Sequence, residues 1–369
     1  MPKNIVLCLD GTGNQLKATA NSNVVLLYSM LDHSDPGQQV AFYDPGVGTM
    51  GARGAWTTWG QKFTKLLGLV FGFGIKDNLE EALVYLMKTY EPGDRVFIFG
   101  FSRGAFTARG LSGLTYRAGV MRKGAENLVP YLVAAYTKGS EFSKDDWAKL
   151  NRFAQIFSKK TDGSPALPVH FLGLWDSVKA LGILRSDPNW PYTRKLPNAR
   201  HVAHAVSIDE RRRPYAEYLV KPDPKSTTTL QETWFAGVHS DVGGGFVDHP
   251  EPGRIALKWM ADRALDHGLI LAAKSYTKLC KLTVADAAGP IHVNGKVWGV
   301  LGLRQRPIEA KSPSIHQSVR DRMTANPSYR IPADPNQVIW DDPDWTTPHP
   351  NMSGPIQAEE PEPVEAIEP

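Results

Sequence analysis

The ten residues Arg95-Val-Phe-Ile-Phe-Gly-Phe-Ser-Arg-Gly104 decide the fold of this chain. Their first half is a continuous run of aromatic and β-branched residues, which is typical of a strand buried on both faces of a parallel sheet. Their second half fits the pattern G-x-S-x-G and leads into a predicted helix at residues 105–114. Glycines at Gly100 and Gly104 let the backbone make a sharp turn against its neighbours. The stretch therefore predicts a turn that exposes the Ser102 hydroxyl at the carboxyl edge of a sheet.

The segments on either side of this turn alternate between strand and helix patterns. We expect strands at residues 4–9, 39–43, 95–100, 168–175 and 230–238, and helices at residues 24–31, 79–91, 105–114 and 202–216. Asp77 or Asn78 is the expected cap of the second helix, because apolar residues recur every three or four positions after it. Alternation of this kind predicts an α/β-hydrolase-like fold, a mostly parallel sheet flanked by helices.

The length of 369 residues suits one large core with insertions. Residues 1–331 are expected to form the α/β-hydrolase domain. Two amphipathic helices, around residues 126–136 and 147–157, predict a helical insertion or cap at residues 120–165. From Pro332 onward the chain has nine prolines, nine acidic residues and no basic one, so we expect residues 332–369 to be a disordered tail.

Charge and hydropathy limit the environment of the protein. Nine of the 38 acidic residues and none of the 42 basic residues lie after Arg330, so the body of the chain is basic and suits an anionic partner such as a phospholipid surface. The longest apolar run, residues 66–75, is too short to span a bilayer, and a buried loop is favoured over an exposed lipid-dipping lip. The N-terminus does not fit a signal peptide. We expect a cytoplasmic protein as synthesised.

A serine hydroxyl becomes a nucleophile only with a histidine base and a carboxylate that orients it, in the order serine, acid, histidine on this fold. Among the acids after Ser102, only Asp176 stands at the tip of a buried strand, which brings it to the same edge as the serine. Among the histidines, His239 ends a strand and precedes Ser240-Asp-Val-Gly-Gly-Gly245, while His201 and His204 are expected on a helix. Ser102, Asp176 and His239 are the predicted catalytic residues.

The reaction also needs two N–H donors for the oxyanion that forms on the substrate. One is expected from Arg103, the residue after the nucleophile, and the other from Gly11 or Thr12 in the glycine turn after the first strand. Asp10 is expected to brace that turn through hydrogen bonds of its side chain.

Several motifs together resemble the DUF2235 α/β-hydrolase family, which includes the catalytic domain of Tle1-type phospholipase effectors of bacterial type VI secretion. They are Asp10-Gly-Thr-Gly-Asn14, Tyr43-Asp-Pro-Gly-Val-Gly48, Gly100-Phe-Ser-Arg-Gly104, Gly173-Leu-Trp-Asp-Ser177, Asp209-Glu-Arg-Arg212 and His239-Ser-Asp-Val-Gly-Gly-Gly245. The resemblance covers roughly residues 3–330. It implies hydrolysis of acyl esters of glycerophospholipids, a peripheral membrane contact and signal-independent secretion. It also matches Ser102, Asp176 and His239 to the family's catalytic residues, with Asp241 in the histidine motif.

Two other classes of function stay open on the sequence alone. A carboxylesterase or lipase acting on another ester or a polyester would use the same three residues. An α/β-hydrolase scaffold without catalysis would be an interaction module. No cofactor, metal or nucleic acid is expected: Gly46-Val-Gly-Thr-Met-Gly51 is not followed by the helix and acidic residue of a dinucleotide site. A secretion or immunity partner is not identifiable from the residues.

Overall fold

The computed structural model describes residues 2–11, 19–46, 63–138, 141–161, 163–179, 189–221, 223–224, 226–293 and 302–352, with side chains from residue 74 onward in the third range. Eight strands form one sheet in the order β2-β1-β3-β4-β5-β6-β7-β8, and every neighbouring pair is parallel. The strands are β1 (Asn4–Leu9), β2 (Gln39–Asp44), β3 (Arg95–Phe101), β4 (Val169–Trp175), β5 (Ala199–Ser207), β6 (Thr229–Phe235), β7 (Ser314–His316) and β8 (Ile339–Asp341). The predicted α/β class and parallel sheet are confirmed.

The central strands are apolar on both faces because helices cover both sides of the sheet. In β1, Ile5, Leu7 and Leu9 pack into one apolar cluster, whereas Val6 and Cys8 pack into another. Successive side chains of a strand point to opposite faces, so an unbroken apolar run is what a doubly covered strand requires. The same alternation divides the run in β3, which the sequence pattern had indicated.

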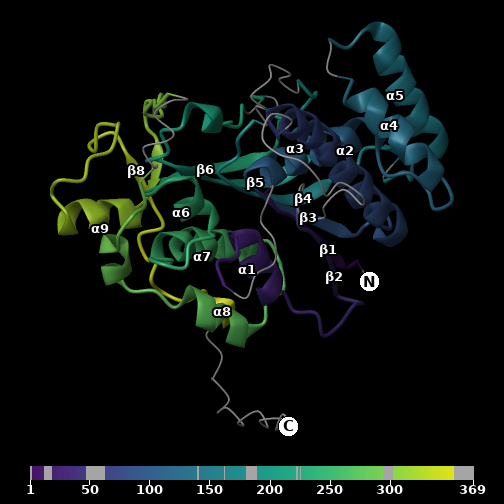
Figure 1. The fold of residues 1–369 in the computed structure, drawn as a ribbon. Coiled ribbons are helices and arrows are strands. Elements are labelled where there is room, and N and C mark those ends of the chain that lie inside the picture. Colours follow the sequence, from purple (N-terminus) through teal and green to yellow (C-terminus); the bar gives the residue numbers. More distant parts are fainter. Residues whose placement is uncertain are drawn as a thin grey trace, which may run out of the picture.

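The helices form the two outer layers (Figure 1). One layer holds α2 (Phe63–Thr89), α3 (Arg103–Ala118), α4 (Val129–Tyr136) and α5 (Lys144–Phe157). The other holds α1 (Asn23–Met30), α6 (His239–Gly243), α7 (Glu251–Asp266) and α8 (Ala273–Cys280), and α9 (Gln317–Ala325) packs near β7 and β8. The pair α4 and α5, in the predicted insertion, packs against α2 and α3.

The parallel order brings the carboxyl ends of β3, β4 and β6 to one edge of the sheet, with only β5 between the last two. Ser102 follows β3, Asp176 follows β4, and His239 begins α6 shortly after β6. Ligands and catalytic groups of parallel α/β sheets gather at this edge. The topology thus brings together three residues that are far apart in the sequence.

The helix predicted at residues 202–216 is wrong. These residues belong to strand β5 and to the extended segment after it, which leads to a short 3-10 helix, Arg213–Tyr215. His201 and His204 therefore lie on opposite faces of a strand, not on one helix face. The spacing of the histidines resembled a helical repeat, but pairing with β4 and β6 on both sides decides the conformation of this segment.

Helix α2 begins well before the predicted cap. Its backbone is helical from Phe63, so Asp77 and Asn78 lie inside the helix and cap nothing. The apolar run at residues 66–75 is therefore helix and not loop, while the side chains of residues 66–73 lie outside the described ones. No described helix is long and apolar enough to cross a bilayer.

The boundary predicted at Pro332 is too early. Strand β8 extends the sheet beyond β7, and Trp345 is buried against α7 and its neighbours. The indole of Trp345 donates to Asp321, which ties this segment to α9. Proline and acid content predicted disorder, but a short edge strand and one buried indole are sufficient to order residues 332–352. Residues 353–369 lie outside the described part of the chain.

Candidate active site

Ser102 occupies a sharp turn between β3 and α3. Its backbone has φ 60° and ψ −123°, a conformation that L-residues rarely adopt. The flanking glycines are required by close backbone contacts: a Cβ on Gly100 would lie 2.6 Å from the carbonyl oxygen of Gly104, and a Cβ on Gly104 would overlap the carbonyl of Leu9. The turn therefore presses against the end of β1, as the G-x-S-x-G pattern predicted.

We expect the Gly104→Ala variant to be destabilised by at least about 1–3 kcal/mol, because its methyl group meets rigid backbone from β1. Gly253→Ala is the matched control. Gly253 lies in helix α7, where alanine is favoured over glycine, and the added methyl group would meet only ordinary contacts of 3.4 Å, with backbone atoms of Asp241 and Gly244. Chemical unfolding measures both. Equal stability of the two variants would show that the turn does not need glycine at residue 104.

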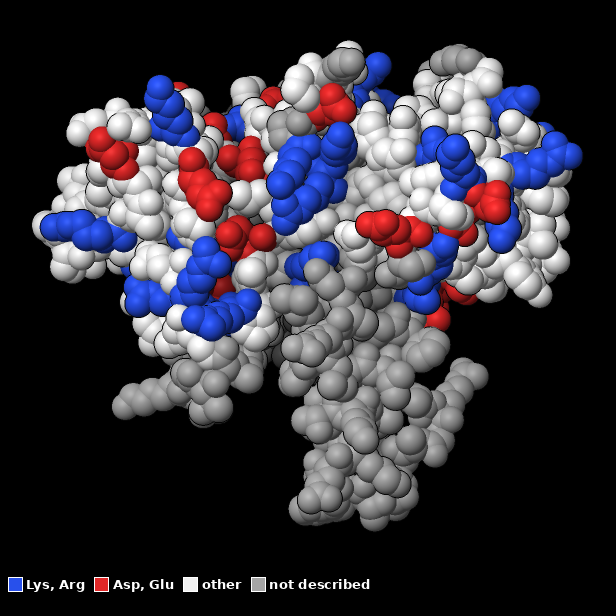
Figure 2. Space-filling view, turned by 90° about the horizontal axis from the view of Figure 1, so that it is seen from above, with Lys and Arg blue, Asp and Glu red and all other residues white. Residues whose placement is uncertain are grey.

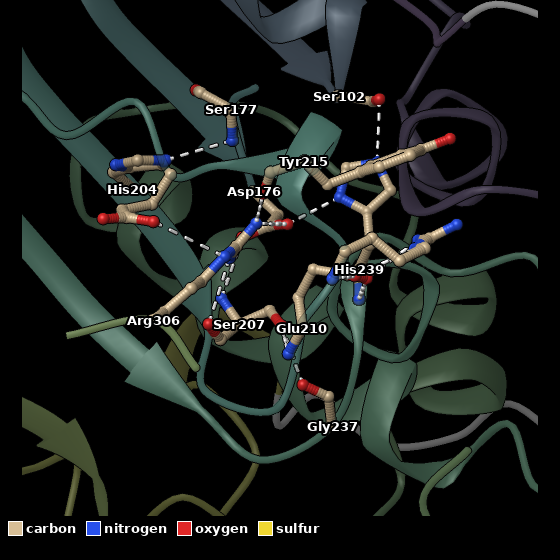
Figure 3. Close-up of polar contacts among 12 residues, drawn as sticks. Ser102, Asp176, Ser177, His204, Ser207, Glu210, Tyr215, Gly237, His239 and Arg306 are labelled. Carbon is tan, nitrogen blue, oxygen red and sulfur yellow. Dashed lines mark hydrogen bonds and ion pairs between the residues drawn. The ribbon is translucent and has the colours of Figure 1, made fainter. Parts of the chain in front are cut away.

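Ser102, His239 and Asp176 form a continuous chain of hydrogen bonds (Figure 3). The Ser102 hydroxyl lies 2.8 Å from Nε2 of His239, and Nδ1 of His239 lies 2.5 Å from Oδ2 of Asp176. All three residues are buried. The Asp176 carboxylate can only accept a hydrogen bond, so Nδ1 of the neutral His239 ring must carry the proton and donate it. Nε2 is then free to accept a hydrogen bond from the Ser102 hydroxyl. This is the tautomer that a general base needs.

Burial and neighbouring charges set the protonation of this pair. Burial lowers the pKa of His239, and Asp176 opposes that effect without reversing it. Burial alone would raise the pKa of Asp176, but the charges and hydrogen bonds of Arg306 and His239 lower it below its usual value. At neutral pH the site therefore holds a neutral imidazole and an ionised carboxylate.

Two aromatic rings contact the His239 ring, and a second carboxylate binds the His239 backbone. The rings of Phe101 and Tyr215 lie 4.6 Å and 5.0 Å from it. Glu210 is buried, pairs with Arg212 and accepts the backbone N–H of His239 at 3.2 Å. The sequence predicted a helix at residues 202–216, which contains Glu210, so its role in anchoring the His239 backbone was missed.

Asp241, expected to support the histidine motif, fixes the turn that carries His239. Its carboxylate accepts the backbone N–H groups of Val238 at 2.9 Å and His292 at 3.0 Å. The other oxygen lies 2.6 Å from Nδ1 of His292. Asp241 thus holds the N-terminus of α6 against a distant segment. Within the described residues, its carboxylate makes no hydrogen bond to the side chains of Ser102, Asp176 or His239.

Arg306 is a second residue of this site, besides Glu210, that the sequence did not indicate. Its guanidinium binds both oxygens of Asp176, with Nη1 at 2.6 Å from Oδ1 and Nη2 at 3.0 Å from Oδ2. It also donates to the backbone carbonyls of Ser207 and Tyr215, and it is only 3% exposed. The Ser207 N–H completes the surroundings of the Asp176 carboxylate at 2.9 Å. A bidentate ion pair of this kind fixes the Asp176 carboxylate in one orientation.

A second buried network lies beside Asp176. The backbone N–H of Ser177 donates to Nε2 of His204, which leaves Nδ1 to donate to Glu232 at 2.8 Å. Burial lowers the pKa of His204 despite that partner. Arg109, fully buried, contacts the same ring from α3. This network supports the strand end that carries Asp176 and does not reach Ser102.

The early glycine turn is only partly described. Asp10 braces it as expected: one carboxylate oxygen accepts the Gly11 N–H at 2.7 Å and the other accepts the hydroxyl of Ser22 at 2.5 Å. The Gly11 N–H is therefore already used, which removes it as an oxyanion donor in this arrangement. Thr12 lies outside the described residues. Arg103 begins α3, where the first N–H groups of a helix have no partner within the helix.

Comparison with known proteins identifies a family. Residues 3–263 match the family described as T6SS phospholipase effector Tle1-like, catalytic domain. "Uncharacterized protein YEL023C" of Saccharomyces cerevisiae (strain ATCC 204508 / S288c) is 36% identical over 229 residues, which are 60% of this chain and 33% of that protein. The chain thus spans about a third of the length of this curated relative.

Two solved structures are also similar. An uncharacterized protein from Pseudomonas aeruginosa has a TM-score of 0.43 and 20% identity, over 73% of this chain and 46% of that one. A Tle1 effector bound to the VgrG spike from the type 6 secretion system has a TM-score of 0.37 and 21% identity, over 67% of this chain and 52% of that one.

Proposed function

Because the chain belongs to the family of Tle1-like phospholipase effector catalytic domains, we propose that it is a serine hydrolase of acyl ester bonds in glycerophospholipids. Ser102 is the proposed nucleophile, His239 the general base and Asp176 the acid that orients it. The observation that carries the proposal is the unbroken hydrogen-bonded chain from the Ser102 hydroxyl through His239 to Asp176. A scaffold without catalysis would have no need to hold a serine in a strained turn facing a neutral histidine.

In the first half of the proposed reaction, His239 Nε2 takes the Ser102 proton while Oγ attacks the ester carbonyl carbon. The C–O bond to the glycerol oxygen then breaks, and His239 returns the proton to that oxygen. The products are an acyl-serine and a lysophospholipid alcohol. Asp176 stabilises the imidazolium that exists between the two proton transfers.

In the second half, His239 takes a proton from water, whose oxygen attacks the acyl-serine carbonyl. The bond to Ser102 Oγ breaks, the serine regains its proton from His239, and a fatty acid leaves. The Arg103 N–H at the start of α3 is the proposed donor to the oxyanion in both halves. Thr12 is the remaining candidate for the second donor, since the Gly11 N–H is bound by Asp10.

Arg306 is proposed to act as a positioning residue. It holds Asp176 ionised and fixed in direction, and through Asp176 it fixes the His239 ring. It lies beyond residue 263, outside the stretch that matches the family. The segment after that match would thus complete the site.

Labelling with a fluorophosphonate, followed by mass-spectrometric mapping of the adduct, tests the nucleophile. We expect one adduct, on Ser102. A screen of diacyl phospholipids against simple acyl esters and polyesters then tests the substrate, and we expect phospholipid turnover with release of fatty acid. Labelling of Ser102 with turnover of simple esters alone would favour a carboxylesterase or polyesterase. No adduct on Ser102 would contradict the proposed chemistry.

A further inference from the structure

Two extended segments cross next to the candidate active site. Residues 209–213, which follow β5, run against residues 302–306. The Arg304 N–H donates to the carbonyl of Arg211 at 2.7 Å, and the Arg213 N–H donates to that of Gly302 at 3.2 Å. Arg212 and Leu303 form an antiparallel bridge between these two bonds. Because alternate residues of paired strands point to opposite sides, Arg211, Arg213 and Arg304 share one side of this ladder, whereas Arg212 and Leu303 share the other.

Three arginines of this ladder, Arg211, Arg213 and Arg304, are exposed, and we call them the arginine face. Within the residues that the structure describes, none of the three forms an ion pair. The carboxylates nearby are already used: Glu210 binds Arg212, and Asp209 accepts from Tyr329 and the backbone of Gly237. The view from above shows basic side chains near its centre, with acidic side chains on several sides of them (Figure 2). The ladder thus carries a local excess of positive charge.

The arginine face lies close to the catalytic candidates along both segments. Arg211 follows Glu210, which binds the His239 backbone, and Arg213 is two residues before Tyr215, whose ring contacts His239. Arg304 is two residues before Arg306, which binds Asp176. A group held by these arginines would therefore contact the two segments that also hold His239 and Asp176 in place.

A cavity of about 580 Å³ with a mixed lining adjoins the face, and its polar lining residues include Asp209, His292 and Gln305. Ile291, Val293, Leu303 and Ile331 line it together with Arg211 and Arg330. Val293 is 86% exposed and Leu303 is 48% exposed, which is unusual for large apolar side chains. Apolar side chains beside arginines that form no ion pair with another described residue match a ligand that has a hydrocarbon part and an anionic part, such as an anionic lipid.

We propose that the arginine face docks onto an anionic lipid surface by binding its phosphate groups. The inference rests on the proposed function and names the surface on which the enzyme works. The planar guanidinium matches a phosphate with two parallel hydrogen bonds, and the three arginines need break no ion pair with a described residue to provide them. Val293, which is exposed and lines the same cavity as Arg211, would then contact the acyl region next to the headgroups.

Vesicle sedimentation of the Ser102→Ala protein tests docking without hydrolysis of the vesicles. One set of vesicles holds phosphatidylcholine alone, and the other holds equal parts of phosphatidylcholine and phosphatidylglycerol. We expect binding to the second set only, weakening as salt is raised. Adding Arg211→Gln, Arg213→Gln and Arg304→Gln should weaken it about 100-fold, since each basic residue near an anionic surface contributes about fivefold.

The matched control removes three exposed basic residues of α5, by Lys144→Gln, Lys149→Gln and Arg152→Gln. Helix α5 packs against α3 near its C-terminal residue Arg117, away from the turn at Ser102. We expect this control to lose less than threefold in binding. An equal loss in both triple variants would overturn the arginine face and point to net charge alone.

Other outcomes also decide the proposal. Release from vesicles by millimolar glycerol phosphate would overturn docking to a surface and indicate a site for a free phosphate compound. Tighter binding to an RNA oligomer, lost in the arginine variant, would overturn a lipid partner. The enzyme could hydrolyse dispersed short-chain phospholipid while its arginine variant still binds vesicles. That pair of results would refute the arginine face as the docking surface and leave the proposed function standing. Docking by a protein without any phospholipid turnover would support it and refute the proposed function.

Discussion

Replacing Ser102 with alanine is expected to lower acyl-ester turnover by about 10³-fold or more while the protein stays folded. The variant loses the oxygen proposed as the nucleophile, and His239 and Asp176 would then have no hydroxyl to activate. The side chain is small and ends at a turn, and the substitution removes one hydroxyl without opening a large cavity. Initial rates with a phospholipid substrate and thermal unfolding measure the two effects.

Ser177→Ala is the matched control for this experiment. Ser177 is also buried and directly follows Asp176, and its hydroxyl has no hydrogen-bond partner among the described residues. Its contact with His204 uses the backbone N–H, which alanine keeps. We expect the control to retain the turnover of the unmodified protein. Similar losses in both variants would mean that disturbance near the sheet edge, and not the nucleophile, explains the result.

The parts of the site that sequence could predict are those with a local cause. The turn at Ser102 needs glycine on both sides because the end of β1 touches it, and that steric demand leaves a readable pattern. Asp176 and His239 each follow a strand, and in a parallel sheet a position after a strand implies a place at one edge. The assignment of these three residues as catalytic stays a prediction until activity is measured.

The parts that were missed depend on distant contacts. Strand β5 has a composition that also suits a helix, and only its pairing with β4 and β6 decides between them. Strands β7 and β8 have three residues each, too few for a periodic pattern. Arg306 lies 130 positions after Asp176 and in no motif, so nothing near it in the sequence indicates its partner.

Arg306 gives the second large expected effect. In Arg306→Gln, the buried Asp176 carboxylate loses its bidentate ion pair. We expect the free energy of unfolding to fall by about 3–5 kcal/mol. Turnover should fall about 10²-fold because the imidazole is held less precisely. Arg306→Lys keeps the positive charge but cannot form the bidentate ion pair. It should therefore lose turnover, with a smaller loss of stability than Arg306→Gln.

The pH profile separates positioning from simple damage. His239 must be neutral to act as a base, so kcat/KM rises with pH through its pKa. The charge of Arg306 helps to lower that pKa, after the larger effect of burial. Removing the charge therefore raises the pKa of His239, and the acidic limb of the profile should move to higher pH in Arg306→Gln. In Arg306→Lys the limb should stay near its original place while the plateau falls.

Arg322→Gln supplies the control for a lost buried arginine. Arg322 is 5% exposed and donates to the carbonyls of Ala287 and Gly289 instead of to Asp176. Its loss should lower stability and leave the acidic limb unmoved. If the limb of Arg306→Gln also stays in place, Arg306 supports the fold without tuning His239. If the acidic limb moves in Arg306→Gln and stays in place in Arg322→Gln, the charge of Arg306 tunes the pKa of His239. Both variants lose a buried arginine, but only Arg306 lies next to Asp176 and His239, so loss of a buried arginine alone would not explain the shift. A residue beyond the family match then helps to set the pH at which His239 acts as a base.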